Sequence, residues 1–108
     1  MWYNIIGDKM IKVYITKDQI KVTGHAKPEV CAAVSAIMYV TANNLLDMQL
    51  LGIDDGKCII DDNPDADYML IKVEKHSKIT DTLMHTLKES LYDIRDGDWE
   101  HIQIKKES

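Results

Sequence analysis

Residues 23–35 read Thr-Gly-His-Ala-Lys-Pro-Glu-Val-Cys-Ala-Ala-Val-Ser, and they mark a passage from strand to helix. Gly24 ends a run in which apolar and polar residues alternate, as they do in a half-buried strand. Pro28 suits the first turn of a helix, where its missing N–H has no partner to lose. Apolar residues then recur at steps of three and four. This spacing predicts a broadly apolar helix over residues 28–50, with Gly52 as its terminator.

The rest of the chain consists of strand patterns and one further helix pattern. Apolar residues on one face of residues 79–94 predict a second helix, which Ser77 or Thr80 could cap and which Gly97 ends. Period-two alternation predicts strands at residues 10–16, 19–23, 68–74 and 101–105, and a short apolar run predicts another at residues 57–61. The order β-β-α-β-β-α-β predicts an α+β fold, with a largely antiparallel sheet packed against two main helices. At 108 residues, we expect a single domain over residues 1–108.

The composition argues against several kinds of partner. The net charge is −5 and basic residues are not clustered, so we expect no nucleic acid partner. No apolar run approaches the roughly 20 residues that span a bilayer, so we expect no membrane association. Cys31 and Cys58 do not form a C-x-x-C spacing and we recognise no secretory signal. These features favour free thiols over a disulfide, in a cytoplasmic protein.

Cys31 and His25 are the candidate catalytic pair. Counted from Pro28, Cys31 lies in the first helical turn, where unpaired backbone N–H groups and the helix dipole favour a thiolate. His25 is six residues earlier, and a turn can bring its imidazole to the sulfur. In acyl transfer a thiolate attacks a carbonyl and an imidazolium protonates the leaving amine. The backbone N–H groups of residues 30–32 are the expected oxyanion donors. Alternatively, Cys31 is a small buried apolar residue.

The motif around this pair is Gly-His-Ala at residues 24–26, followed by Val-Cys-Ala-Ala-Val-Ser-Ala at residues 30–36. The two segments together resemble the signature of the ribosomal-processing cysteine proteases, the Prp family. The likeness extends over most of the chain from about residue 10 onward, in the order of its elements as well as in the motif. The resemblance implies a small homodimeric cysteine endopeptidase. Such enzymes remove a short N-terminal extension from a bacterial large-subunit ribosomal protein.

The resemblance also implies roles for individual residues. Cys31 would be the nucleophile and His25 the base. We expect Gly24, Ala26 and Ser35 to bind substrate or support the site. Ser35 lies one helical turn beyond Cys31, although a small residue that permits close packing is the alternative interpretation. We identify no third catalytic residue and expect no metal or cofactor.

The chain departs from the family pattern in two places. Family members usually carry a longer loop between these residues, often with an acidic residue before the helix. Here five residues separate His25 from Cys31, and Pro28 begins the helix. Residues 1–9 precede the family pattern, and they are interpreted as an extra strand or the result of an upstream start.

Two alternatives to ribosomal-protein processing follow from this comparison. Relatives of the family occur in bacteriophage genomes. A phage-borne or diverged member would cleave another protein, such as a capsid or scaffold protein. The second alternative is a catalytically silent, dimeric binding module that kept the fold.

Other polar patterns are weaker candidates. Oxygen-bearing residues alternate along residues 61–67, but the Gly and Glu of an EF-hand are missing, so a solvated turn is favoured. A zinc site at His25 and Cys31 lacks two further ligands. Cys58 is expected to be structural, and Trp99 is expected to be a core or interface residue.

Overall fold

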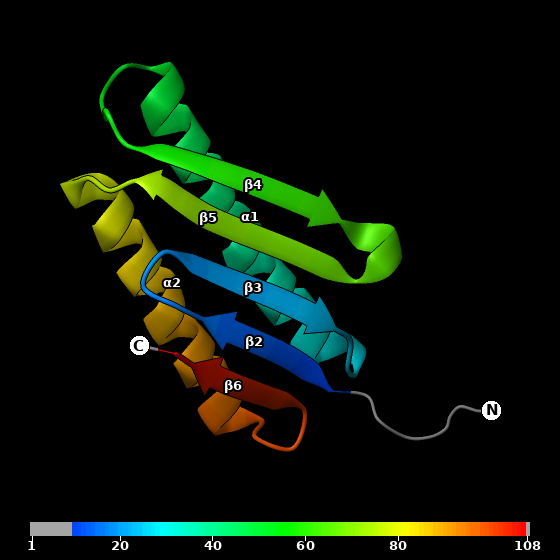
Figure 1. Cartoon of the computed structure of the whole chain (residues 1–108). Coiled ribbons are helices and arrows are strands. Elements are labelled where there is room, and N and C mark those ends of the chain that lie inside the picture. The colour runs from blue at the N-terminus through cyan, green and yellow to red at the C-terminus, as the bar shows by residue number, and fades with distance from the viewer. Residues whose placement is uncertain (1–9, 108) are drawn as a thin grey trace.

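The computed structural model describes residues 10–107, so the interpretation of residues 1–9 as an extra strand lies outside the described range. The chain forms a hairpin, a helix, a second hairpin, a second helix and a last strand (Figure 1). The elements are β2 (Ile11–Ile15), β3 (Gln19–Gly24), α1 (Pro28–Leu50), β4 (Lys57–Asn63), the short 3₁₀ helix η1 (Pro64–Ala66), β5 (Tyr68–Lys75), α2 (Lys78–Gly97) and β6 (Ile102–Lys106). The predicted α+β fold and its order are confirmed.

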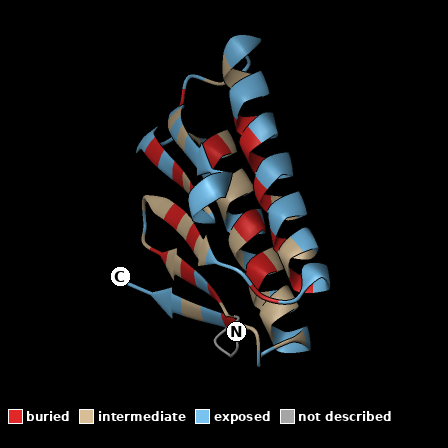
Figure 2. Cartoon of the chain, turned by 90° about the vertical axis from the view of Figure 1, so that its right-hand side faces the viewer, coloured by how far each residue is buried: buried red, intermediate tan, exposed pale blue. Residues whose placement is uncertain are grey.

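The five strands form one sheet in the order β4-β5-β3-β2-β6. Neighbouring strands are antiparallel except for β2 and β6, which are parallel. α1 carries the chain from β3 across β5 to β4, and α2 carries it from β5 across β3 and β2 to β6. Both helices cover the same face of the sheet, so the molecule has two layers (Figure 1 and Figure 2).

The core lies between these two layers, where inward-facing strand residues meet the helices (Figure 2). The alternation in β2 buries Ile11, Val13 and Ile15 and leaves the residues between them more exposed. The helices supply Met38 and Leu91, which are 1 % and 0 % exposed. Burying an apolar side chain of this size contributes about 1.5–3 kcal/mol to folding. The sheet is thereby fixed against α1, the helix that carries Cys31.

The two helices begin and end where the local sequence favours it. The Thr80 N–H donates to the Ser77 hydroxyl at 3.0 Å, and the Ser77 N–H donates to the Thr80 hydroxyl at 2.8 Å. The two predicted caps of α2 therefore act together as a capping box. Gly52 has a φ of +71° directly after the end of α1, which agrees with its predicted role as terminator.

One of the two alternatives expected for Trp99 was wrong. Trp99 does not belong to the core: it lies in the turn between α2 and β6 and is 71 % exposed. Its place at an interface remains a prediction.

α1 is long and apolar enough to cross a membrane by length and composition alone, and it is the one such helix within residues 10–107. Core helices of folded domains can meet the same criterion, and α1 buries one side in the core.

Candidate active site

Cys31 lies in the first turn of α1, as Pro28 predicted. Its half-buried sulfur makes two contacts with the backbone of one residue, Ala26. The Ala26 N–H donates to Sγ at 3.2 Å, and the thiol donates to the Ala26 carbonyl at 3.3 Å. An N–H aimed at sulfur stabilises a negative charge there better than a neutral thiol, because hydrogen bonds to ions are stronger. The Ala26 backbone therefore supports Cys31 directly.

His25 follows the last residue of β3 and is paired with a carboxylate from a distant part of the chain. Its Nδ1 lies 2.8 Å from Oδ2 of Asp67, which stands between η1 and β5. The two side chains are 57 % and 49 % exposed, so the pair is accessible from solvent. The imidazole can exchange protons with solvent or with a bound substrate while it remains anchored on one nitrogen.

Gly24 fixes the end of β3 where the chain turns toward His25. Its φ is +81°, and a Cβ at this position would lie 2.6 Å from the carbonyl oxygen of Met10. A side chain would thus meet both a disfavoured backbone conformation and a steric conflict. The Gly24 N–H donates to the carbonyl oxygen of Asp67 at 3.0 Å. Gly24 is therefore needed for the geometry beside His25.

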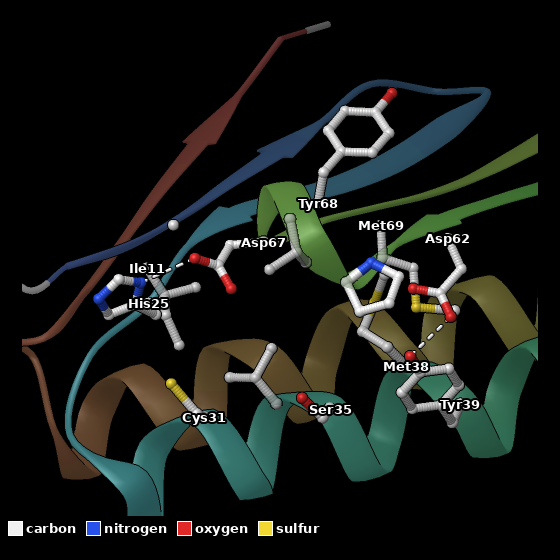
Figure 3. Close-up of a pocket in the computed structure, with 14 residues that line it drawn as sticks. Ile11, His25, Cys31, Ser35, Met38, Tyr39, Asp62, Asp67, Tyr68 and Met69 are labelled. Carbon is white, nitrogen blue, oxygen red and sulfur yellow. Dashed lines mark hydrogen bonds and ion pairs between the residues drawn. The ribbon is translucent and has the colours of Figure 1, made fainter.

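Cys31 and His25 line the same pocket, of about 170 Å³, between α1 and the sheet (Figure 3). Val34 and Met38 line it from α1, and Met69 lines it from β5. The remaining lining residues include Ile11, Val22, Gly24, Ser35, Tyr39, Asp62, Pro64, Asp67 and Tyr68. The pocket is thus lined by apolar side chains together with several polar ones.

Tyr39 and Asp62 line the part of the pocket that lies away from Cys31 (Figure 3). The Tyr39 hydroxyl donates to Oδ2 of Asp62 at 2.6 Å. This hydrogen bond raises the pKa of Tyr39, because loss of the phenolic proton would remove the bond and place two negative charges together. The bond joins α1 to β4, so this end of the pocket is set by side chains from two elements.

The structure places the predicted site residues around one pocket. The roles of the Ala26 backbone and of the N–H groups at the start of α1 differ from those expected. Gly24 and Ser35 line the pocket, whereas Ala26 contributes through its backbone contacts to Cys31. The Val30 and Cys31 N–H groups, expected as oxyanion donors, both donate to the Lys27 carbonyl at 3.1 Å. The expectation was wrong for these two groups because the turn that begins α1 occupies them.

Cys31 and His25 are not directly bonded. Within residues 10–107, no hydrogen bond joins the two side chains, because each makes its contacts elsewhere. Catalytic hydrogen bonds often form only when substrate is bound, so their shared pocket keeps the pair a candidate for catalysis.

Asp67 is the site residue that sequence reasoning missed. It closes the acidic run at residues 61–67, which was interpreted as a solvated turn, and nothing in its spacing pointed to His25. Register could have located it, because Thr23 pairs with Tyr68 across β3 and β5. That pairing brings the residues just beyond each strand to the same edge of the sheet.

Over residues 10–107, no group of three or more His, Cys, Asp or Glu is arranged to hold a metal ion.

Thiol hydrolases use a cysteine with a histidine near it, and Cys31 and His25 line one pocket of this α+β domain. Residues 10–103 match the family model described as cysteine protease Prp, and the chain belongs to this family. The protein is therefore a cysteine protease. The resemblance recognised from the motif at residues 24–36 is confirmed.

Solved structures share the fold. The essential ribosomal processing protease Prp from S. aureus, in complex with a covalently linked product peptide, matches with a TM-score of 0.76 at 22% identity, over 91% of this chain and 100% of that chain. The same protease with a substrate peptide gives 0.77 at 20% identity, with the same coverage. SMU.848 from Streptococcus mutans gives 0.68 at 18% identity, over 91% of this chain and 94% of that chain. Among curated proteins, none matches this chain.

Proposed function

We propose that this protein is a processing endopeptidase that removes a short N-terminal extension from a bacterial large-subunit ribosomal protein, with Cys31 as nucleophile and His25 as base. The observation that carries this proposal is the common pocket of the two side chains. The S. aureus protease of the same fold, described as a ribosomal processing protease, holds a covalently linked product peptide. A covalent link to product is consistent with nucleophilic catalysis.

The proposed reaction is acyl transfer in two steps. His25 accepts the Cys31 proton, and the thiolate attacks the carbonyl carbon of the scissile peptide bond. The tetrahedral intermediate collapses with loss of the amine, which takes the proton from His25 and leaves a thioester on Cys31. Water, deprotonated by His25, then hydrolyses the thioester, releasing the carboxylic acid and restoring the thiol.

The substrate segment would lie extended over the end of β3 with apolar side chains in the pocket. Val34, Met38 and Met69 supply an apolar lining that suits such side chains. Gly24 leaves its side of the pocket without a side chain, which permits close approach of a substrate backbone. Ser35 is exposed in the same pocket one turn from Cys31, so its hydroxyl is available to a bound peptide.

Incubation with the precursor of the ribosomal protein, followed by intact-mass spectrometry, tests this function. We expect a mass loss equal to the extension, abolished in Cys31→Ala and reduced at least about 100-fold in His25→Ala. Cys58→Ser is the matched control and should retain cleavage, because Cys58 lies outside the pocket. Cleavage that persists in Cys31→Ala would disprove the assignment of the nucleophile.

The short connection between His25 and Cys31 favours a second candidate, a phage-borne or diverged protease with another protein substrate. Five residues form this connection. A shorter loop beside the pocket would change the surface that a bound peptide contacts. Capsid and scaffold proteins would be the substrates in this case. Their cleavage, with no cleavage of the ribosomal precursor, would support this candidate. Absence of cleavage of all these proteins, with Cys31 unreactive, would support a silent binding module.

We further propose that the protein acts in the cytoplasm as a homodimer. The C-terminal end of α1 and the following turn expose Leu50, Leu51 and Ile53 at 84 %, 70 % and 58 %. Apolar surface of this kind is stabilised when a second copy covers it. Light scattering after size exclusion should give twice the chain mass, and Leu50→Glu should halve it. Ile59→Glu, at an exposed apolar residue on β4, is the control and should remain dimeric.

A further inference from the structure

We propose that Asp67 is a positioning residue that holds His25 in the tautomer needed to accept the Cys31 proton. A carboxylate can only accept hydrogen bonds, so the contact at 2.8 Å requires His25 Nδ1 to carry the hydrogen. In the neutral ring Nε2 is then the acceptor, and it is the nitrogen left for the thiol proton. This inference rests on the proposed function of Cys31 and His25.

The backbone around Asp67 is built to hold its carboxylate in place. Asp67 has left-handed dihedral angles, φ 50° and ψ 54°, which Asp adopts more readily than most residues. The preceding turn is closed by the Asn63 side chain, which accepts from the Ala66 N–H at 3.3 Å. The Asp67 N–H also donates to the Pro64 carbonyl at 3.2 Å. The carboxylate is therefore presented from an ordered turn.

Asp67 contacts two consecutive residues, Gly24 at the end of β3 and His25 directly after it. Its carbonyl oxygen accepts from the Gly24 N–H at 3.0 Å, and its side chain accepts from His25. The bond from the Gly24 N–H to the Asp67 carbonyl fixes the distance between the two chain segments. The His25 and Asp67 side chains therefore lose little further conformational freedom when they make their contact. The register of β3 and β5, in which Thr23 pairs with Tyr68, extends directly into these two contacts.

A histidine–aspartate contact alone does not identify a functional pair in this acidic chain. His76 contacts Asp81 at 2.6 Å, and His101 contacts Asp98 at 2.5 Å. Neither of those histidines lines the pocket that contains Cys31, whereas His25 and Asp67 both do. The shared pocket is what distinguishes the His25–Asp67 pair, and the other pairs provide matched controls.

The experiment measures the rate at which iodoacetamide labels Cys31 at pH 7 in a Cys58→Ser background, so that one thiol reacts. We expect Asp67→Asn to slow labelling several-fold, as His25→Ala should. Asn is also tolerated in left-handed geometry, so the turn should persist. Asp67→Gly, which removes the side chain in a conformation that Gly adopts freely, should have the same effect. Asp81→Asn, which breaks the pair with His76, should leave the rate unchanged.

A double-variant cycle tests whether Asp67 acts through His25. In His25→Ala, adding Asp67→Asn should not slow labelling further, because the residue that Asp67 positions is gone. On a cleaved substrate, Asp67→Asn should lower kcat at least about tenfold with little change in KM, and Asp67→Glu should restore part of it. Wild-type labelling in Asp67→Asn, or additive effects in the cycle, would overturn the inference. Absence of precursor cleavage with intact coupling would count against the proposed substrate alone.

Discussion

The backbone N–H of Ala26 and the sulfur of Cys31 are 3.2 Å apart, and the thiol returns a hydrogen bond to the Ala26 carbonyl. The reactive atom is therefore held by the connection that leads into its own helix. The connection between His25 and Cys31 is short, so the position of the sulfur and the position of the imidazole are linked through a few backbone bonds. This linkage makes the site sensitive to changes in the backbone around it.

The two cysteines should differ in reactivity. Burial raises the pKa of the Cys58 thiol, so Cys58 holds its proton at neutral pH. Cys31 lines the pocket and has the Ala26 N–H aimed at its sulfur, so this N–H can stabilise the negative charge of the attacking sulfur. At pH 7 we expect iodoacetamide to label Cys31 at least about tenfold faster than Cys58. Single Cys→Ser variants assign each signal, and equal rates would argue against an activated Cys31.

Gly24→Ala should destabilise the protein more than Gly52→Ala does. Both glycines have positive φ, which costs an L-residue about 1–2 kcal/mol. A Cβ at Gly24 would also lie 2.6 Å from a backbone oxygen, whereas nothing lies within 4 Å of a Cβ at Gly52. Urea unfolding measures both variants. Equal losses of unfolding free energy would show that the close contact at Gly24 is relieved without cost.

Ser77→Ala should lower the free energy of unfolding by about 1 kcal/mol, since it removes the cap of α2. Ser90→Ala is the matched control. The Ser90 hydroxyl donates to the Thr86 carbonyl inside the same helix, and Ala has the higher helix propensity. Ser90→Ala should therefore be neutral or slightly stabilising in urea unfolding. A loss at Ser90 as large as that at Ser77 would contradict the assigned capping box.

His76 should give the protein a stability that depends on pH. Hydrogen bonds to Asp81 and then Asp18 raise the pKa of His76 in the folded state above its ordinary value of 6.5. The protonated form is the stabilised one, so this contribution is complete below pH 6.5 and is lost as the pH rises through the folded-state pKa.

Chemical denaturation of wild type and His76→Gln at a series of pH values tests this prediction. The difference in unfolding free energy should be largest near pH 6 and should disappear well above the raised pKa. Because the groups are exposed, we expect a difference below about 1 kcal/mol. A difference that stays constant with pH would show that the His76 contacts are not ionic.

The fold could be predicted because most of it follows from local patterns. Alternation located the strands, and Pro28 and Gly52 gave the limits of α1 to within two residues. The parallel pairing of β2 with β6 could not be read from the sequence. It depends on how α2 packs across the sheet, and the short alternating run before the C-terminus carries no information about its partner.

The site was only partly predictable for the same reason. His25 and Cys31 are close in sequence, so a motif could identify them. Asp67 is 42 residues from His25 and reaches it only because β3 and β5 pair in one particular register. The occupied N–H of Cys31 did follow from the sequence, because a helix that begins at Pro28 pairs it with the Lys27 carbonyl by the i→i−4 pattern, whereas the Val30 bond to the same carbonyl depends on the local turn.

The placement of β3 at the centre of the sheet has a consequence for amide hydrogen exchange. β3 is bonded on both sides, whereas β4 is an edge strand with one neighbour. Fluctuations that fray β4 would move Asp62 and leave the end of β3 beside His25 paired. We expect amide exchange to be faster in β4, which carries Asp62, than in β3, which ends beside His25, so the pocket wall at β4 would yield before the wall at His25.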